Sequence, residues 1–141
     1  MTSVDFYFNV ADKSMLVAQL LHKALQQHRQ ATVFLADEAV ATRLSDYLWQ
    51  AQPSSFIAHV CAGDALAPHT PVVLDWQAKS IFQDDILLNL QTAQPSFFSR
   101  FKRLIEVVGL DEADKAEARK RYAFYRDRGY TIQSVDLSKP Q

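Results

Sequence analysis

Apolar positions along this chain follow two different spacings. Short runs rich in β-branched and aromatic residues are typical of β-strands, whereas apolar residues recurring every three to four positions are typical of helices. The strand-like runs are Val4–Val10, Ala31–Ala36, Ser55–Val60, Pro71–Trp76, Asp84–Leu90, Arg103–Val108 and Tyr130–Leu137. Helical spacing predicts helices from Asp12 or Ser14 to Leu25, from Asp37 through Trp49, and from Asp111 to Gly129.

The order of these elements predicts an α/β fold. Strand, helix, strand and helix follow one another through short links, which predicts a parallel sheet covered on both faces. Between Phe56 and Val108 the strands follow one another without a full-length helix, so either part of the sheet is antiparallel or one crossover is short. With no repeat, low-complexity tract or linker, we predict one domain over residues 1–141, a three-layer Rossmann-like sheet flanked by helices.

Glycine content bears on whether such a fold binds a nucleotide. The chain has only three glycines, Gly63, Gly109 and Gly129, and none follows the first strand, where a dinucleotide site needs a tight turn. P-loop, metalloprotease and serine-hydrolase motifs are missing as well. We therefore expect the fold without the nucleotide site, no cofactor and no catalytic site.

One cluster offers a competing hypothesis, a small metal-binding protein or enzyme. His59, Cys61, Asp64 and His69 are four potential zinc ligands within eleven residues. Ligand pairs spaced as C-x₂-C or H-x₃-H are absent, and an unpaired cysteine is often a buried apolar residue. We expect a core cysteine and surface histidines here, and no metal.

The neighbouring acids Asp84 and Asp85 are a second catalytic alternative. Paired carboxylates can serve as general acid and base. With no basic or metal-binding partner nearby in the sequence, we expect both to be solvated.

Composition and charge narrow the class of protein. The chain has 141 residues and a formal net charge of −1, which argues against bulk electrostatic binding to nucleic acid. Its single cysteine favours a reducing compartment, and neither a leader nor an apolar run of about 20 residues is present. We expect a cytoplasmic protein that does not enter a membrane.

The helix Asp111–Gly129 departs from this charge balance. Between Lys115 and Arg128 six Lys and Arg residues face two acids, so this segment carries +4. At 100° per residue, four of its residues fall within an arc of about 60°: Lys115, Arg119, Tyr122 and Arg126. We call these four residues the basic column.

Helix-dipole chemistry accounts for part of this charge, because cations are favoured near a helix C-terminus. It does not account for the rings of Tyr122, Phe124, Tyr125 and Tyr130, which interleave with Arg119, Arg121 and Arg126. The combination favours a ligand with carboxylates at one end and an apolar residue at the other. Single-stranded nucleic acid is the weaker alternative, because the whole chain is near neutral.

Trp49 also breaks its local pattern. Helical geometry turns it about 180° from Val40, which belongs to the apolar face of the helix Asp37–Trp49. Either the following segment Pro53–Phe56 folds back over the indole, or Trp49 anchors a partner protein, and tryptophan is enriched at such anchors. We favour the anchor.

With these residues in view, the chain resembles the chi subunit of the bacterial DNA polymerase III holoenzyme. The stretches that carry the resemblance are FYF near the start, LADEAVATRLSDYLWQAQPSSFIAHVCAGD, DDILLNL and ARKRYAFYRDRGY. The resemblance implies a non-catalytic accessory subunit of the clamp-loader assembly, with a Rossmann-like fold that binds no nucleotide.

The resemblance also implies two protein partners and no direct contact with nucleic acid. Members of this family bind the psi subunit, at positions that match Trp49 and Phe56, with His59 nearby. They also bind the acidic C-terminal tail of single-stranded DNA-binding protein, which ends in phenylalanine, at positions matching Lys115, Arg119 and Tyr122. Between Val108 and Asp111 the chain is shorter than the family pattern, in the region that forms the rim of the tail pocket.

Overall fold

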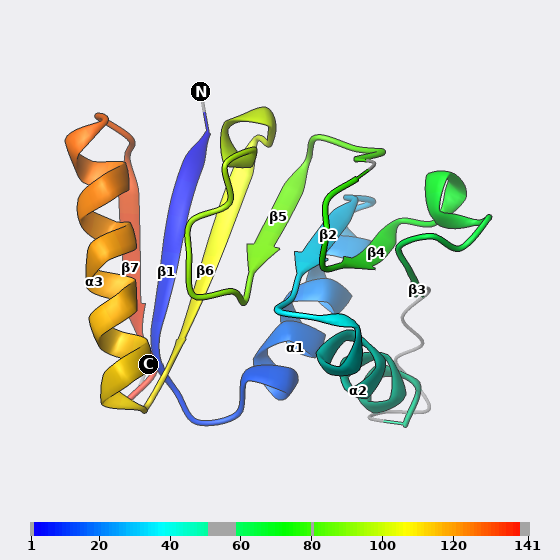
Figure 1. Ribbon diagram of the computed structural model, residues 1–141, viewed down its shortest axis with the longest axis horizontal. Coiled ribbons are helices and arrows are strands. Elements are labelled where there is room, and N and C mark those ends of the chain that lie inside the picture. The colour runs from blue at the N-terminus through cyan, green and yellow to red at the C-terminus, as the bar shows by residue number, and fades with distance from the viewer. Residues whose placement is uncertain (1, 51–58, 80, 139–141) are drawn as a thin grey trace.

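The computed structural model describes residues 2–50, 59–79 and 81–138. Within these ranges a sheet of seven strands is flanked by three α-helices (Figure 1). The strands are β1 (Ser3–Val10), β2 (Ala31–Phe34), β3 (His59–Cys61), β4 (Val72–Asp75), β5 (Ile86–Asn89), β6 (Arg103–Gly109) and β7 (Ile132–Asp136). The helices are α1 (Lys13–Gln26), α2 (Glu38–Gln50) and α3 (Glu112–Asp127), with 3₁₀ turns η1 (Ala67–His69) and η2 (Phe98–Arg100).

The sheet has the order β3-β4-β2-β5-β6-β1-β7, and every strand pair in it is parallel. The two possibilities left open by the sequence are therefore resolved in favour of short crossovers. In the described residues, η1 lies in the connection from β3 to β4 and η2 in that from β5 to β6. Because all strands run the same way, their carboxyl ends meet at one edge of the sheet.

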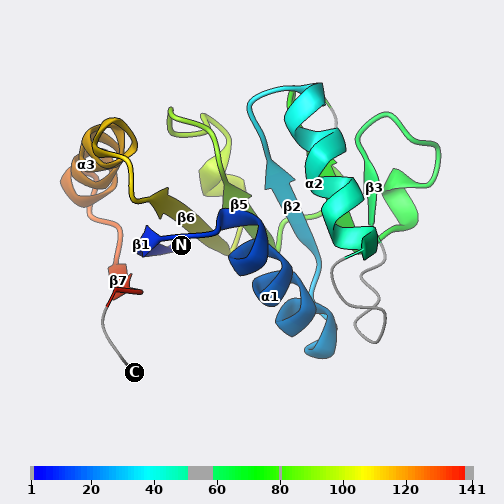
Figure 2. The ribbon, with the colours of Figure 1, turned by 90° about the horizontal axis from the view of Figure 1, so that it is seen from below.

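Helices cover both faces, which confirms the expected three layers. Side chains of α1 and α2, among them Leu21 and Leu44, share one apolar cluster with Val33 of β2. Tyr125 of α3 lies in a second cluster with Phe6 of β1. Figure 2 shows α1 and α3 on opposite sides of the sheet. Right-handed crossovers produce this arrangement, because connections toward β3 cross one face and connections back cross the other.

Helix ends follow the expected local chemistry. The carboxylates of Asp12, Asp37 and Asp111 accept hydrogen bonds from the backbone N–H groups of Met15, Val40 and Ala113 at 3.1, 2.9 and 3.1 Å. These bonds satisfy donors that the first helical turn leaves unpaired. After α3, Gly129 adopts φ +82°, a conformation that glycine tolerates best.

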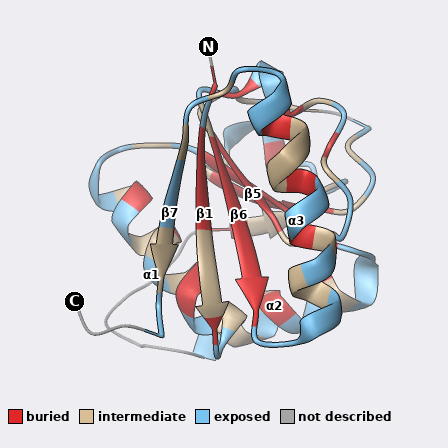
Figure 3. Cartoon of the chain, turned by 90° about the vertical axis from the view of Figure 1, so that its left-hand side faces the viewer, coloured by how far each residue is buried: buried red, intermediate tan, exposed pale blue. Residues whose placement is uncertain are grey.

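Burial falls off toward the β7 edge (Figure 3). Strand β6 is almost wholly buried, whereas β7 consists of exposed and half-buried residues. No helix in the described ranges is long and apolar enough to cross a membrane.

The acid pair before β5 differs from the expectation of two solvated carboxylates. Asp85 forms an ion pair with Arg29, whose Nε lies 2.8 Å from both of its oxygens, while Asp84 is exposed. The hydrogen bond from Arg29 holds the pKa of Asp85 below its ordinary value, although partial burial opposes this shift. Arg29 lies 56 residues earlier in the chain, so the expectation based on sequence neighbours was wrong.

This ion pair predicts a pH-dependent contribution to stability. Because the pKa of Asp85 is lower in the folded state, its charge stabilises the fold above the unfolded value of about 3.9. That contribution is lost as the pH falls through the folded-state pKa. We expect Asp85→Asn to lower Tm by about 3–5 °C at pH 7 and by much less near pH 2. Calorimetry of both proteins, with Asp84→Asn as the matched control, checks this, and a pH-independent difference would contradict it.

Candidate functional site: two protein-docking surfaces

The basic column forms one flank of α3. Arg119 and Arg126 are exposed, and Lys115 and Tyr122 are half-buried. The helix turns Ala118 toward the sheet, where it is fully buried. Four side chains that the sequence groups by angle are therefore accessible together, beside the point where α3 meets β1.

Aromatic rings lie under this flank. The Tyr122 ring packs on Phe6 of β1, with a centroid distance of 5.3 Å. Phe8, two residues further along the strand, stacks on Phe6 at 5.5 Å and is itself only half-buried. Successive strand residues point to opposite faces, so Phe6 and Phe8 share the α3 face. The flank thus combines an apolar floor with a row of cations.

The cations of the column differ in their own partners. Lys115 Nζ lies 3.8 Å from a Glu112 carboxylate oxygen, and Arg126 Nε lies 3.2 Å from Asp127. Both are surface pairs, which contribute little and exchange readily for another anion. Arg119 forms no ion pair with any residue in the described ranges, which leaves its guanidinium available to a ligand.

Arg121 and Tyr125 do not belong to this surface, contrary to the expected interleaving of rings and cations. Arg121 is 1% exposed and Tyr125 is fully buried. Both contact Glu106, a fully buried acid in the middle of β6.

These residues form a buried polar network between α3 and the sheet. Glu106 accepts hydrogen bonds from Arg121 Nε at 3.0 Å, the Tyr125 hydroxyl at 2.6 Å and Asn89 Nδ2 at 3.0 Å. Arg121 Nη1 also donates to the carbonyl of Thr92 at 2.6 Å. Every buried side-chain polar atom in the described ranges has a hydrogen-bond partner.

Burial and hydrogen bonding act on the Glu106 carboxyl in opposite directions. Burial raises the pKa of its carboxyl, and Arg121, Tyr125 and Asn89 oppose that shift. Arg121 and the Asn89 Nδ2 group can only donate to its oxygens, whereas the Tyr125 hydroxyl can donate to a carboxylate or accept from a protonated carboxyl. Burial and the neighbouring Glu106 raise the pKa of Tyr125, which keeps its hydroxyl protonated and donating.

The sequence carried a signal for this network that was missed. Glu106 interrupts the otherwise apolar run Leu104–Val108, and an acid in a buried strand requires a buried partner. The partner lies 15 residues later, on a helix whose other cations face solvent.

A hollow of about 550 Å³ opens beside the exposed Leu110, at the start of α3. Its α3 lining includes Ala113 and Glu117. At 100° per residue these positions lie about 160° from Lys115, on the opposite flank from the basic column. Leu110 therefore borders a different part of the surface from the aromatic rings of Phe6, Phe8 and Tyr122 beside the basic column.

The second surface centres on Trp49, near the end of α2. Its side chain is 52% exposed, which agrees with the outward orientation expected from helical spacing. The indole lies against the ring of His59 on β3, with centroids 4.6 Å apart. Phe56 lies outside the described residues, as does the segment 53–56 that was the alternative cover for Trp49.

His59 is only 4% exposed, so the expectation of a surface histidine was wrong at this position. Its Nε2 lies 3.0 Å from the hydroxyl oxygen of Ser45 on α2. The buried His59 ring therefore packs against the inner side of the Trp49 indole. His69, in contrast, is exposed as expected.

The four candidate zinc ligands do not converge. No group of three His, Cys, Asp or Glu residues in the described ranges could hold a metal ion. The Asp64 carboxylate instead accepts a hydrogen bond from the backbone N–H of Leu66 at 2.8 Å. Burial, with Glu38, Asp64 and Asp46 nearby, raises the pKa of the half-buried Cys61 thiol, which disfavours the thiolate that zinc requires.

Comparison with known proteins places the chain in a family. The family described as DNA polymerase III chi subunit, HolC, matches residues 1–133. The chain belongs to the DNA polymerase III chi subunit family. Chi is by name an accessory subunit of the polymerase that carries out DNA replication.

Related chi subunits match over most of their length. DNA polymerase III subunit chi of Pseudomonas aeruginosa is 34% identical over 143 residues, covering 99% of both chains. The Haemophilus influenzae chi subunit is 33% identical over 77% of this chain and 76% of its own. The Escherichia coli chi subunit is 29% identical, covering 95% of this chain and 90% of its own.

The chi fold also resembles a domain of another protein. The C-terminal domain of the DEAD-box protein Dbp5 superposes with a TM-score of 0.67 over 97% of this chain and 92% of that domain. The sequences are only 12% identical, so the likeness concerns the fold alone. It agrees with the predicted Rossmann-like α/β architecture.

Proposed function

We propose that this chi-family chain is a cytoplasmic adaptor that links the clamp loader to single-stranded DNA-binding protein during replication. One surface, at Trp49, Phe56 and His59, binds the psi subunit. The other, the basic column, binds the acidic C-terminal tail of single-stranded DNA-binding protein. The chain then meets nucleic acid only through this second partner.

The observation that carries the proposal is that Arg119 is exposed beside the half-buried rings of Tyr122 and Phe8. A short peptide that ends in phenylalanine offers carboxylates and an apolar ring within a few ångströms of each other. Arg119 and Lys115 supply donors for the carboxylates, and Tyr122 with Phe8 supplies apolar surface for the ring.

Charge-assisted hydrogen bonds would supply much of the affinity. Each is worth about 1.5–3 kcal/mol when the pair is shielded from water. Arg126 lies seven residues beyond Arg119 on the same flank, about 10 Å further along the helix. It is therefore placed to meet an acidic residue upstream of the tail's terminal phenylalanine.

Substitution of Arg119 tests the tail site. We expect Arg119→Ala to weaken binding of an acidic, phenylalanine-terminated peptide at least tenfold in a fluorescence titration, because it removes a charged donor without disturbing a buried contact. The fold should be unaffected, since Arg119 is exposed.

Lys120→Ala is the matched control. Lys120 has the same charge, lies next to Arg119 on the same helix and pairs with Glu117 at 3.2 Å, away from the column. Equal losses for the two variants would indicate a general charge effect, and unchanged affinity of Arg119→Ala would refute the assigned site. Tight, strongly salt-dependent binding of an oligonucleotide by the chain alone would favour a direct nucleic-acid binder.

A further inference from the structure

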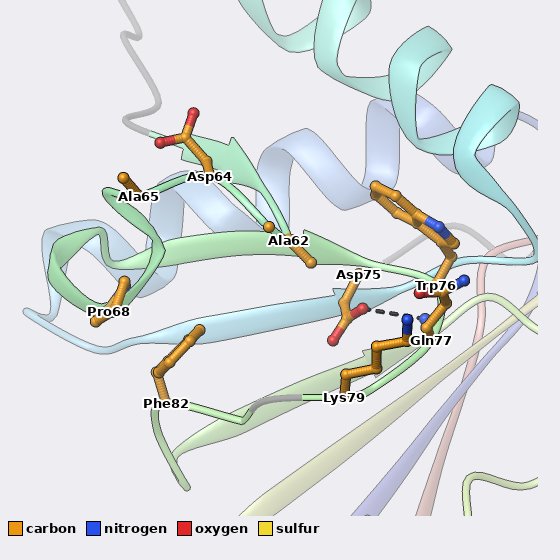
Figure 4. A pocket seen from close by; sticks show the side chains of 10 residues that line it. Ala62, Asp64, Ala65, Pro68, Asp75, Trp76, Gln77, Lys79 and Phe82 are labelled. Carbon is orange, nitrogen blue, oxygen red and sulfur yellow. Dashed lines mark hydrogen bonds between the residues drawn. The ribbon is translucent and has the colours of Figure 1, made fainter.

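A second hollow, far along the sheet from the basic column, has no role in the proposed function. It has a volume of about 450 Å³ and opens at the carboxyl ends of β3 and β4 (Figure 4). The residues that define its chemistry are Asp64, Ala65, Pro68, Asp75, Lys79 and Phe82.

The hollow lies where loops, and not a helix, cover this face of the sheet. α3 packs over β1 and β6, whereas Thr32 of β2 and Val73 of β4, further along the sheet, line a small cavity together with the loop residues Pro68 and Phe82. Loops cover a flat sheet less completely than a helix does. Space therefore remains between the β3–β4 loop and the segment after β4.

A buried carboxylate lies at the base of this space. Asp75, the last residue of β4, is only 3% exposed. Its Oδ1 accepts hydrogen bonds from the backbone N–H groups of Gln77 and Ala78, both at 3.1 Å. Its Oδ2 accepts no hydrogen bond from any residue in the described ranges, and Figure 4 shows the carboxyl group directed toward the space between Phe82 and Lys79.

Every buried side-chain polar atom in the described ranges is paired, so the unpaired Oδ2 is open to the hollow although Asp75 as a whole is buried. A cationic donor that enters the hollow would form a charge-assisted hydrogen bond with it. Lys79 lines the hollow but forms no ion pair with an acid among the described residues. Asp64 also lines the hollow, with its carboxylate directed away from Asp75 in Figure 4. The hollow therefore suits a positively charged donor that enters from outside.

The apolar residue at the mouth of the hollow indicates that the cationic donor belongs to a protein segment. Phe82, which lines the hollow, is 46% exposed. A large aromatic side chain exposed beside a hollow is typical of surfaces that bind protein segments.

We propose that this hollow binds an arginine side chain presented by a protein partner, with Asp75 Oδ2 as its acceptor and Phe82 as an apolar wall. A guanidinium suits the site better than an ammonium. It is planar, weakly hydrated, able to donate two N–H groups to one carboxylate oxygen, and able to stack on a ring.

Small probes test the site on the purified chain. Nα-acetyl-arginine amide is titrated against the backbone N–H signals of Gln77 and Ala78 by NMR, with the uncharged isostere Nα-acetyl-citrulline amide as the matched ligand. We expect the arginine probe to bind at least tenfold more tightly. Equal binding of the two probes would overturn the proposal.

Two substitutions provide opposite expected results. Asp75→Asn keeps an oxygen for the N–H groups of Gln77 and Ala78 but removes the charge, and should weaken the arginine probe at least tenfold. Lys79→Met removes a competing cation and should tighten it two- to fivefold. Unchanged affinity in Asp75→Asn would overturn the site. If that variant fails to fold, the citrulline comparison and Lys79→Met decide the matter.

A peptide distinguishes a protein partner from a small basic molecule. The pentapeptide Ala-Leu-Arg-Leu-Ala, blocked at both ends, should bind at least threefold more tightly than the single-residue amide, because its leucines add apolar contact with the exposed Phe82. Equal affinity would overturn the protein-partner assignment.

Discussion

Replacing Arg121 with methionine is expected to lower the free energy of unfolding by about 3–5 kcal/mol, the usual cost of removing one partner from a buried ion pair. Methionine matches the length of the arginine stem but leaves the Glu106 carboxyl buried without its cationic partner. The carbonyl of Thr92 loses a donor as well. Chemical denaturation measures the loss, and thermal unfolding should show Tm lower by about 10 °C or more.

Two further variants separate the buried charge from the loss of packing. Arg126→Met makes the same replacement at an exposed site on α3 and should change stability by less than about 0.5 kcal/mol. The double variant Glu106→Met/Arg121→Met removes both charges, so it should lose less stability than the two single losses added together. A loss below about 1 kcal/mol in Arg121→Met, or strict additivity in the double variant, would contradict the ion-pair account.

Replacing Trp49 with alanine is expected to abolish co-purification with a psi subunit. Truncating a central aromatic anchor typically costs about 2 kcal/mol or more, which corresponds to roughly thirtyfold in affinity. Trp49 is 52% exposed while its indole lies on the ring of His59, so a partner that covers the outer face would bury it completely. Isothermal titration with a purified psi subunit measures the loss directly.

The controls for this prediction use a conservative variant and an unrelated apolar residue. Trp49→Phe keeps a ring over His59 and should retain part of the affinity. Met15→Ala removes an apolar side chain of similar exposure, 49%, from α1 and should have no effect. Binding of the acidic tail peptide should be unchanged in all three variants, and its loss together with psi binding would indicate misfolding.

Local chemistry explains why most elements were predictable. Asp12, Asp37 and Asp111 begin the helices by hydrogen bonds to N–H groups two or three residues away, and such contacts are encoded within a few residues. The parallel middle of the sheet was less predictable. There η1 and η2 replace full-length crossover helices, so the usual alternation of strand and helix is missing.

The features of the candidate sites were likewise predictable where they depend on local geometry and unpredictable where they depend on distant segments. The basic column was predictable because helix geometry decides which side chains share a flank once the helix is known. Contacts between distant segments were not predictable: Arg29 with Asp85, His59 beneath Trp49, and Glu106 with Arg121. Arg119 and Arg121 are the same residue type two positions apart, and nothing in their immediate sequence says which one is buried.

By itself the sequence determined the α/β class, the helix bounds, the basic column and the family resemblance, because each rests on local spacing or on residues read in order. Only the tertiary structure decided which charged groups are paired inside the protein and which remain for partners. A buried charge is strongly destabilising unless a distant segment brings a partner to it, as β6 brings Glu106 to Arg121. That is why Arg119 faces solvent while Arg121, half a turn away, helps to hold α3 on the sheet.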